Sequence, residues 1–180
     1  FEHLPYVYNP PEGVILSANN KCVPDEYTYP LTYHWIEMPH RAERLSDLIK
    51  NRGNDFDVEV MMKIQTDTKN YLWHNIRSVL LQTFPLDSNS QKALNILKEW
   101  DGDFTTDSVP ATIFSFWFKE IKKLQPKPYI ELLNLTNTLF ITNQLVLNGE
   151  FCKTTNSVNC KQYLSYTLQT AMQNLITRLG

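Results

Sequence analysis

Asn19 and Arg41 are the residues of this chain whose types best suit bond-breaking chemistry. The side-chain amide of Asn19 could donate a hydrogen bond to an oxyanion, because a rigid neutral donor needs no reorganisation as negative charge develops. Arg41 could supply a fixed cation that supports the polar groups of such a site. The plainer alternatives are that Asn19 only forms a turn with Asn20, and that Arg41 is a solvated helix residue paired with a nearby glutamate.

The chain has four histidines, and two of them lie close to Arg41 in sequence. His34 and His40 flank Trp35 in the segment that precedes Arg41, so these three residues are candidates for lining a pocket. His3 lies in a predicted N-terminal coil, and His74 lies inside a predicted amphipathic helix. Surface or packing roles are the simpler expectation for both.

A short strand followed by a loop should position the asparagines. Asn9-Pro10-Pro11-Glu12-Gly13 is a turn signal, because proline fixes φ and glycine permits unusual backbone angles. Val14-Ile15-Leu16 then predicts a short buried strand that ends just before the asparagines. Residues 21–38 are rich in aromatic residues and contain two prolines, so we predict an ordered loop.

The rest of the chain has the apolar spacing of helices. Pro39 suits a first helical turn, either Asp55 or Asp57 can cap a second helix, and Asp87 can cap a later one. We therefore predict a mainly α fragment with six or seven helices and one N-terminal strand, in a single domain over residues 1–180. Residues 1–38 would form the strand and active-site loop, and residues 39–180 the helical region. Residues expected in the core include Met61, Met62, the aromatic residues of 114–118, and the stripe Leu164, Leu168, Ala171, Leu175 and Leu179.

Composition excludes several function classes. The 180 residues carry a formal net charge of −2 and no basic run, which disfavours nucleic acid as a partner. No apolar stretch is long enough to cross a membrane, and five glycines leave little material for a nucleotide-binding loop. The three cysteines have no metal-site spacing. Cys152 and Cys160 bracket a polar loop, and their spacing fits a small disulfide and two reduced thiols equally well.

The order of several motifs resembles the penicillin acylase (penicillin amidase) family of N-terminal-nucleophile hydrolases. These motifs are Ser17-Ala18-Asn19-Asn20-Lys21, Val23-Pro24-Asp25-Glu26-Tyr27, Trp35, His40-Arg41-Ala42-Glu43-Arg44-Leu45, Gln65-Thr66-Asp67, Glu99-Trp100-Asp101-Gly102, and the loop bracketed by Cys152 and Cys160. The resemblance covers essentially the whole chain. It places these residues in the middle part of the large (β) subunit of a layered αββα hydrolase.

The resemblance implies a role for each matched position. An asparagine at the position of Asn19 completes the oxyanion hole, and an arginine at the position of Arg41 supports the hydrogen-bond network of the site. The nucleophile of the family is a serine at the start of the large subunit, exposed by self-cleavage, whose own α-amine acts as general base. This chain starts at Phe1, so we expect the nucleophile outside it and no catalytic activity from the chain alone.

Further expectations concern partners and cofactors. The partners would be the rest of the same precursor, including the small subunit, and a small N-acyl amide substrate. Export, which is usual in the family, would favour a Cys152–Cys160 disulfide. Some members bind calcium, so calcium is possible in the complete enzyme, but one ligand position falls near Pro30, which offers no carboxylate, and this chain therefore does not support a calcium site.

The alternative function is partner binding: the chain would be a helical module that binds another molecule without catalysing a reaction. An upstream self-cleavage serine in the full-length protein would separate the two readings. We also expect the chain alone to self-associate around residues 14–16, because an unpaired apolar strand invites pairing.

Overall fold

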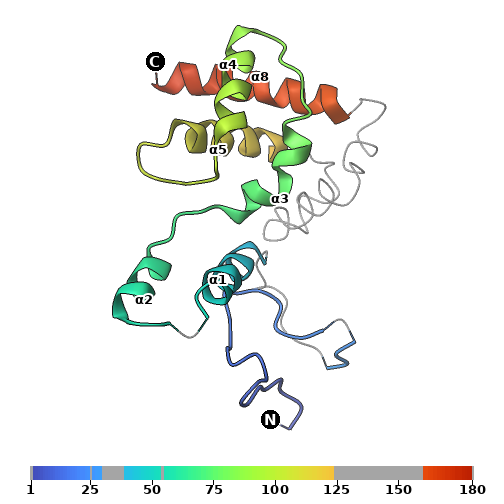
Figure 1. Ribbon diagram of the computed structural model, residues 1–180. Coiled ribbons are helices and arrows are strands. Elements are labelled where there is room, and N and C mark those ends of the chain that lie inside the picture. The colour runs from blue at the N-terminus through green and yellow to red at the C-terminus, as the bar shows by residue number, and fades with distance from the viewer. Residues whose placement is uncertain (1, 25, 30–38, 54, 124–159, 180) are drawn as a thin grey trace. The chain divides into compact units, whose positions relative to one another are not determined.

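The computed structural model describes residues 2–24, 26–29, 39–53, 55–123 and 160–179. The chain divides into two compact units, Phe1–Asp67 and Thr68–Gly180, and each is described by itself. Within the described residues the chain forms helices and no β-sheet (Figure 1). The helices are α1 (His40–Lys50), α2 (Val58–Gln65), α3 (Tyr71–Leu80), α4 (Ser88–Glu99), α5 (Val109–Lys123) and α8 (Cys160–Leu179).

The first unit begins with the predicted turn. The backbone N–H of Gly13 donates to the carbonyl oxygen of Pro10 at 2.9 Å, and Gly13 has a φ of +67°. Residues with a side chain rarely adopt this left-handed conformation, which glycine enters without steric penalty. The turn expected over residues 9–13 is therefore confirmed.

The predicted strand at residues 14–16 is wrong for this structure, because these residues are irregular. Ile15, expected to be buried, is 64% exposed. A strand needs a neighbour to pair its backbone N–H and C=O groups. Among the described residues, the one β-type pairing is an isolated bridge between Lys69 and Asp103 in the second unit. The apolar run thus has no pairing partner there.

The two helices of the first unit begin where the sequence indicates. Pro39 is the N-cap residue of α1, and the Asp57 carboxylate caps α2 by accepting from the N–H of Val60 at 2.7 Å. Of the two candidate caps for α2, Asp57 is the one used. Met61 and Met62 are 52% and 60% exposed, so their predicted place in the core is wrong. Val60 is the one residue of α2 that the structure shows as buried.

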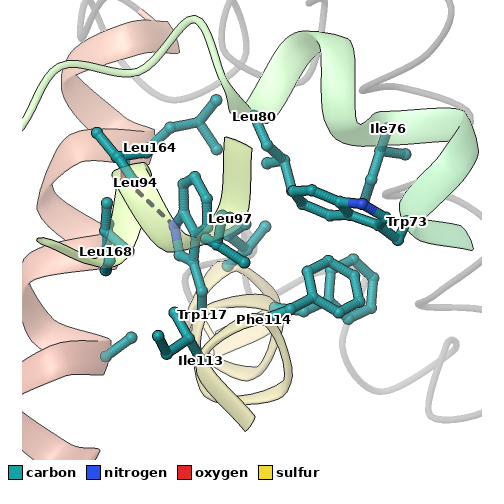
Figure 2. Packing of buried hydrophobic residues seen from close by; sticks show 14 of the residues in the cluster. Trp73, Ile76, Leu80, Leu94, Leu97, Ile113, Phe114, Trp117, Leu164 and Leu168 are labelled. Atoms are coloured by element: carbon teal, nitrogen blue, oxygen red, sulfur yellow. Dashed lines mark hydrogen bonds between the residues drawn. The ribbon is translucent and has the colours of Figure 1, made fainter. Parts of the chain in front are cut away.

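The second unit contains the main hydrophobic core, built from α3, α4, α5 and α8. Figure 2 shows Trp117 of α5 at its centre, between leucines of α4 and α8, with Trp73 and Phe114 beside it. Trp117 is fully buried, and Phe114 and Phe118 are nearly so. The prediction that the aromatic residues of 114–118 belong to the core is confirmed for these three.

Polar groups inside this core are paired between α5 and α8. Trp117 Nε1 donates to the Leu164 carbonyl oxygen at 3.2 Å and to Thr167 Oγ1 at 3.1 Å (Figure 2 draws the first). The Tyr163 hydroxyl donates to the Ile121 carbonyl oxygen at 2.8 Å. Burial raises the pKa of Tyr163 well above its ordinary value, so the hydroxyl keeps its proton as a donor. These bonds fix how the two helices meet.

The segment Trp100-Asp101-Gly102 forms a tight turn against the start of α3. Gly102 has a φ of +89°, and an added Cβ would lie 3.0 Å from Trp73 Cδ1. Its carbonyl oxygen accepts from the Asn70 N–H at 2.8 Å, and Asn70 in turn caps α3. A glycine is needed here both for the backbone angle and for the close approach of the indole.

Several predictions fall outside the described residues or stay untested. Residues 124–159 of the predicted helical region lie outside them, and the single domain over residues 1–180 stays a prediction. In the described part of the chain, no helix combines the length and apolar character that a membrane crossing requires.

Candidate active site

The loop that carries Asn19 is shaped by its neighbour Asn20. The side-chain oxygen of Asn20 accepts from the backbone N–H of Ala18 at 3.0 Å, and its Nδ2 donates to the Lys21 carbonyl oxygen at 3.1 Å. This side-chain turn encloses Asn19, whose φ is +61°. Asparagine tolerates that left-handed conformation better than most residues. The loop therefore presents the Asn19 side chain at its exposed apex.

The structure brings Asn19 and Arg41 together. Arg41 lies in the first turn of α1, and its Nη2 donates to Asn19 Oδ1 at 2.7 Å and to the Ala18 carbonyl oxygen at 3.2 Å. These residues are 22 positions apart in the chain. The plainer reading of Asn19 as a turn residue is correct for its backbone, but its side chain has a specific charged partner as well.

This contact decides which way the Asn19 amide faces. A guanidinium group only donates hydrogen bonds, so the atom that faces Arg41 must be the amide oxygen. The Nδ2 group is thereby directed elsewhere, and no described residue accepts a hydrogen bond from it. The bond from a cation to Oδ1 also polarises the amide, which strengthens Nδ2 as a donor. Arg41 thus orients and activates a hydrogen-bond donor.

An ion pair between Arg44 and Asp67 anchors the same helix. Arg44 donates from Nε to Asp67 Oδ1 at 2.8 Å and from Nη2 to Asp67 Oδ2 at 2.7 Å. Asp67 follows the C-cap of α2, and its N–H bonds the Ile64 carbonyl oxygen at 3.3 Å. In the sequence, Arg44 and Asp67 stood out only as members of two separate motifs that resemble the family, with no role assigned to either. Their pairing could not be inferred, because they lie 23 positions apart.

His40 adjoins Arg41 but faces a group on its own helix. Its Nδ1 lies 3.5 Å from a carboxylate oxygen of Glu43, and its side chain is only 11% exposed. Burial lowers the pKa of His40 below its ordinary value, and the Glu43 carboxylate partly offsets this effect. A neutral imidazole is favoured as a result. Its place in a substrate pocket stays a prediction.

The other sequence candidates lie apart from this contact or outside the described residues. His34, Trp35, Cys152 and Pro30 lie outside them, so nothing tests their predicted roles. Cys160 is the first residue of α8. His3 and His74 stack on Tyr29 and Tyr71, which fits the packing roles expected for them.

The described residues hold no cluster of three His, Cys, Asp or Glu side chains that could bind a metal ion. The chemistry that this arrangement can perform by itself is the stabilisation of negative charge. A polarised amide donor and a fixed guanidinium suit a developing oxyanion.

One comparison with known families covers the entire chain. The model of the family described as penicillin amidase matches residues 1–180, which includes the asparagine loop, α1 and the whole helical core. The motif resemblance noted in the sequence and this match agree over the same residues. The chain belongs to the penicillin amidase family, and is thereby of penicillin-acylase hydrolase type.

Proposed function

We propose that this chain supplies the oxyanion-stabilising part of an enzyme that cleaves N-acyl amides through an acyl-enzyme. Asn19 Nδ2 would donate to the oxyanion, and Arg41 would hold and polarise the Asn19 amide. The single observation that carries the proposal is the 2.7 Å hydrogen bond from Arg41 Nη2 to Asn19 Oδ1. It pairs the two residues that the family resemblance marks.

The proposed reaction places Asn19 at two equivalent steps. The hydroxyl of the family's nucleophilic serine attacks the amide carbonyl carbon while its proton passes to the α-amine of that serine. The carbonyl oxygen becomes negative in the tetrahedral intermediate, and Asn19 Nδ2 donates to it. The α-ammonium group then passes its proton to the leaving nitrogen as the C–N bond breaks, which releases the amine and leaves an acyl-enzyme. Water attacks this ester while its proton passes to the α-amine, and the same donor stabilises the second oxyanion. The proton returns to the serine oxygen as the ester C–O bond breaks and the carboxylic acid leaves.

The remaining features of the proposal follow from the family. The complete enzyme would be a layered αββα N-terminal-nucleophile hydrolase, matured from a zymogen and exported, with a Cys152–Cys160 disulfide. The rest of the same precursor would be the partner of this chain, and His34, Trp35 and His40 would line its substrate pocket. The chain alone would be inactive. Penicillins and fatty acyl homoserine lactones are candidate substrate classes.

The test is amide hydrolysis by the full-length protein and two variants. Asn19→Ala should lower kcat by about 10²–10³-fold, since one oxyanion donor is lost. Asn9→Ala is the matched control, because Asn9 is also an exposed asparagine at positive φ, 45° against 61°. Both variants introduce alanine in a left-handed backbone, so both share the strain of that change.

The outcome separates a donor from a turn residue. A kcat loss confined to Asn19→Ala supports the proposal, and an unchanged kcat in that variant contradicts it. A full-length protein with no serine at the self-cleavage position and no hydrolysis would instead favour a partner-binding module.

A further inference from the structure

We infer that Asp67 and Arg44 are positioning residues for the oxyanion site, which act through α1 on Arg41 and Asn19. This inference rests on the proposed function, because it assigns to that site a support that the family match does not identify. The observations that carry it are the paired hydrogen bonds of Arg44 and the poor burial of α1.

Helix α1 lacks the usual means of fixing its rotation. A surface helix is normally oriented by an apolar face buried in a core. As far as the described residues show, no residue of α1 is buried, and its N-cap residue, Pro39, makes no side-chain capping bond. The expected apolar residues Ala42, Leu45, Leu48 and Ile49 remain partly exposed. Polar contacts must therefore contribute more to its orientation than packing does.

The contact between Arg44 and Asp67 supplies that restraint. Two parallel N–H···O bonds, at 2.8 and 2.7 Å, fix both the distance and the angle of the guanidinium group. The side chains of Arg44 and Asp67 are only 25% and 18% exposed, so water screens the pair less than it screens a surface pair. Asp67 is itself held at the end of α2 by its backbone bond to Ile64.

The restraint reaches Arg41 directly along the helix. Residues three apart on a helix lie on the same side, separated by a rise of about 4.5 Å. A rotation or shift of α1 at Arg44 therefore moves Arg41 by a similar amount. A shift of about 1 Å would stretch both the 2.7 Å bond from Arg41 to Asn19 Oδ1 and the 3.2 Å bond to the Ala18 carbonyl oxygen beyond hydrogen-bond length. Asn19 would then lose the partner that orients its amide.

The test is a double-mutant cycle on the full-length enzyme, with kcat and KM measured separately. Asp67→Asn keeps the shape of the side chain but removes its charge. We expect it to lower kcat by about 10–100-fold with little change in KM, because small misplacements of a catalytic group are costly. In the Asn19→Ala background the same change should alter kcat by less than about twofold, since the group that it positions is absent.

Glu59→Gln is the matched control, because Glu59 is an exposed acid on α2 and has no hydrogen bond or ion pair among the described residues. It should leave kcat unchanged within about twofold in both backgrounds. Arg44→Lys retains the positive charge but cannot form the two parallel hydrogen bonds to Asp67. If Asp67→Asn does not accumulate as folded protein, Arg44→Lys replaces it in the cycle.

The outcomes test the positioning role of Asp67 and Arg44 separately from the proposed role of Asn19 as an oxyanion donor. Equal kcat losses from Asp67→Asn with and without Asn19 would overturn the inference and mark a general structural role. An unchanged kcat for Asp67→Asn alone would also overturn it. Neither result affects the proposed function, which fails separately if Asn19→Ala keeps full activity.

Discussion

The two ends of one amide group explain why asparagine suits position 19. Its oxygen accepts from Arg41, and its nitrogen is left to donate. The sequence indicated Asn19 and Arg41 individually, because their types suit charge stabilisation and their spacing matches a known family. The bond between them could not be predicted, because it depends on the path of the intervening residues. Likewise, the sequence indicated that Asn20 lies in a turn, but not that its side chain accepts a hydrogen bond from the Ala18 N–H.

His40 offers a test of electrostatics beside the site. Burial is the main cause of its lowered pKa, and attraction to Glu43 opposes it. The folded chain therefore binds the His40 proton less tightly than the unfolded chain does. The contribution of His40 to stability is complete above pH 6.5, the ordinary pKa of histidine, and is lost as the pH falls from there towards the pKa of the folded state.

The variant Glu43→Gln should lower the pKa of His40 further, because it removes the carboxylate that favours the charged imidazole. An NMR titration of the His40 ring in the two proteins measures this change. A higher His40 pKa in the variant would contradict the account of these opposing effects.

At the scale of elements, helix caps were more predictable than the strand. Asp57 and Asp87 were expected as caps, and each carboxylate accepts a backbone N–H of its helix. A cap depends on neighbours in the sequence, which are always present. The strand at residues 14–16 depends on a partner strand, and the described residues supply none. Asn70, whose side chain caps α3, was not among the predicted caps.

Helix α8 provides a matched pair of leucines for a stability test. Leu168 is fully buried against the core, whereas Leu179 is 67% exposed at the end of the same helix. Leu168→Ala should lower the free energy of unfolding by about 2–5 kcal/mol, through lost burial and the cavity that it leaves. Leu179→Ala should change it by less than about 0.5 kcal/mol.

Urea denaturation of the chain, followed by tryptophan fluorescence, measures both values. Equal losses in the two variants would contradict the burial of Leu168 and the exposure of Leu179. The predicted stripe on α8 is thus correct for Leu164, Leu168 and Ala171, but Leu179 extends beyond the core.

At the scale of the whole molecule, the core and the candidate site lie in different units. The large core cluster belongs wholly to Thr68–Gly180. The asparagine loop, α1 and α2 belong to Phe1–Asp67, where the buried apolar residues among those described are Ala18, Val23 and Val60. Periodicity predicted the core well, because four helices of one unit share it. Periodicity could not predict that few residues of Phe1–Asp67 are buried, because an apolar helix face in the sequence does not identify the residues that pack against it.

This division bears on the proposed enzyme. A site whose helix has little packing of its own depends on polar anchors and, in our proposal, on the rest of the precursor. The self-association expected of the isolated chain stays a prediction, and light scattering would measure it.

The most direct test of the central claim is kcat for Asn19→Asp in the full-length enzyme. Aspartate keeps the size of the side chain, tolerates the positive φ of 61° and still accepts from Arg41. It replaces the donor nitrogen with an acceptor oxygen and adds a negative charge, so the proposed donor to the oxyanion is lost. Asn9→Asp makes the same change of charge at the exposed residue Asn9. Our account predicts a kcat loss of about 10²–10³-fold or more for Asn19→Asp. Activity equal to that of Asn9→Asp and the unaltered enzyme would contradict it.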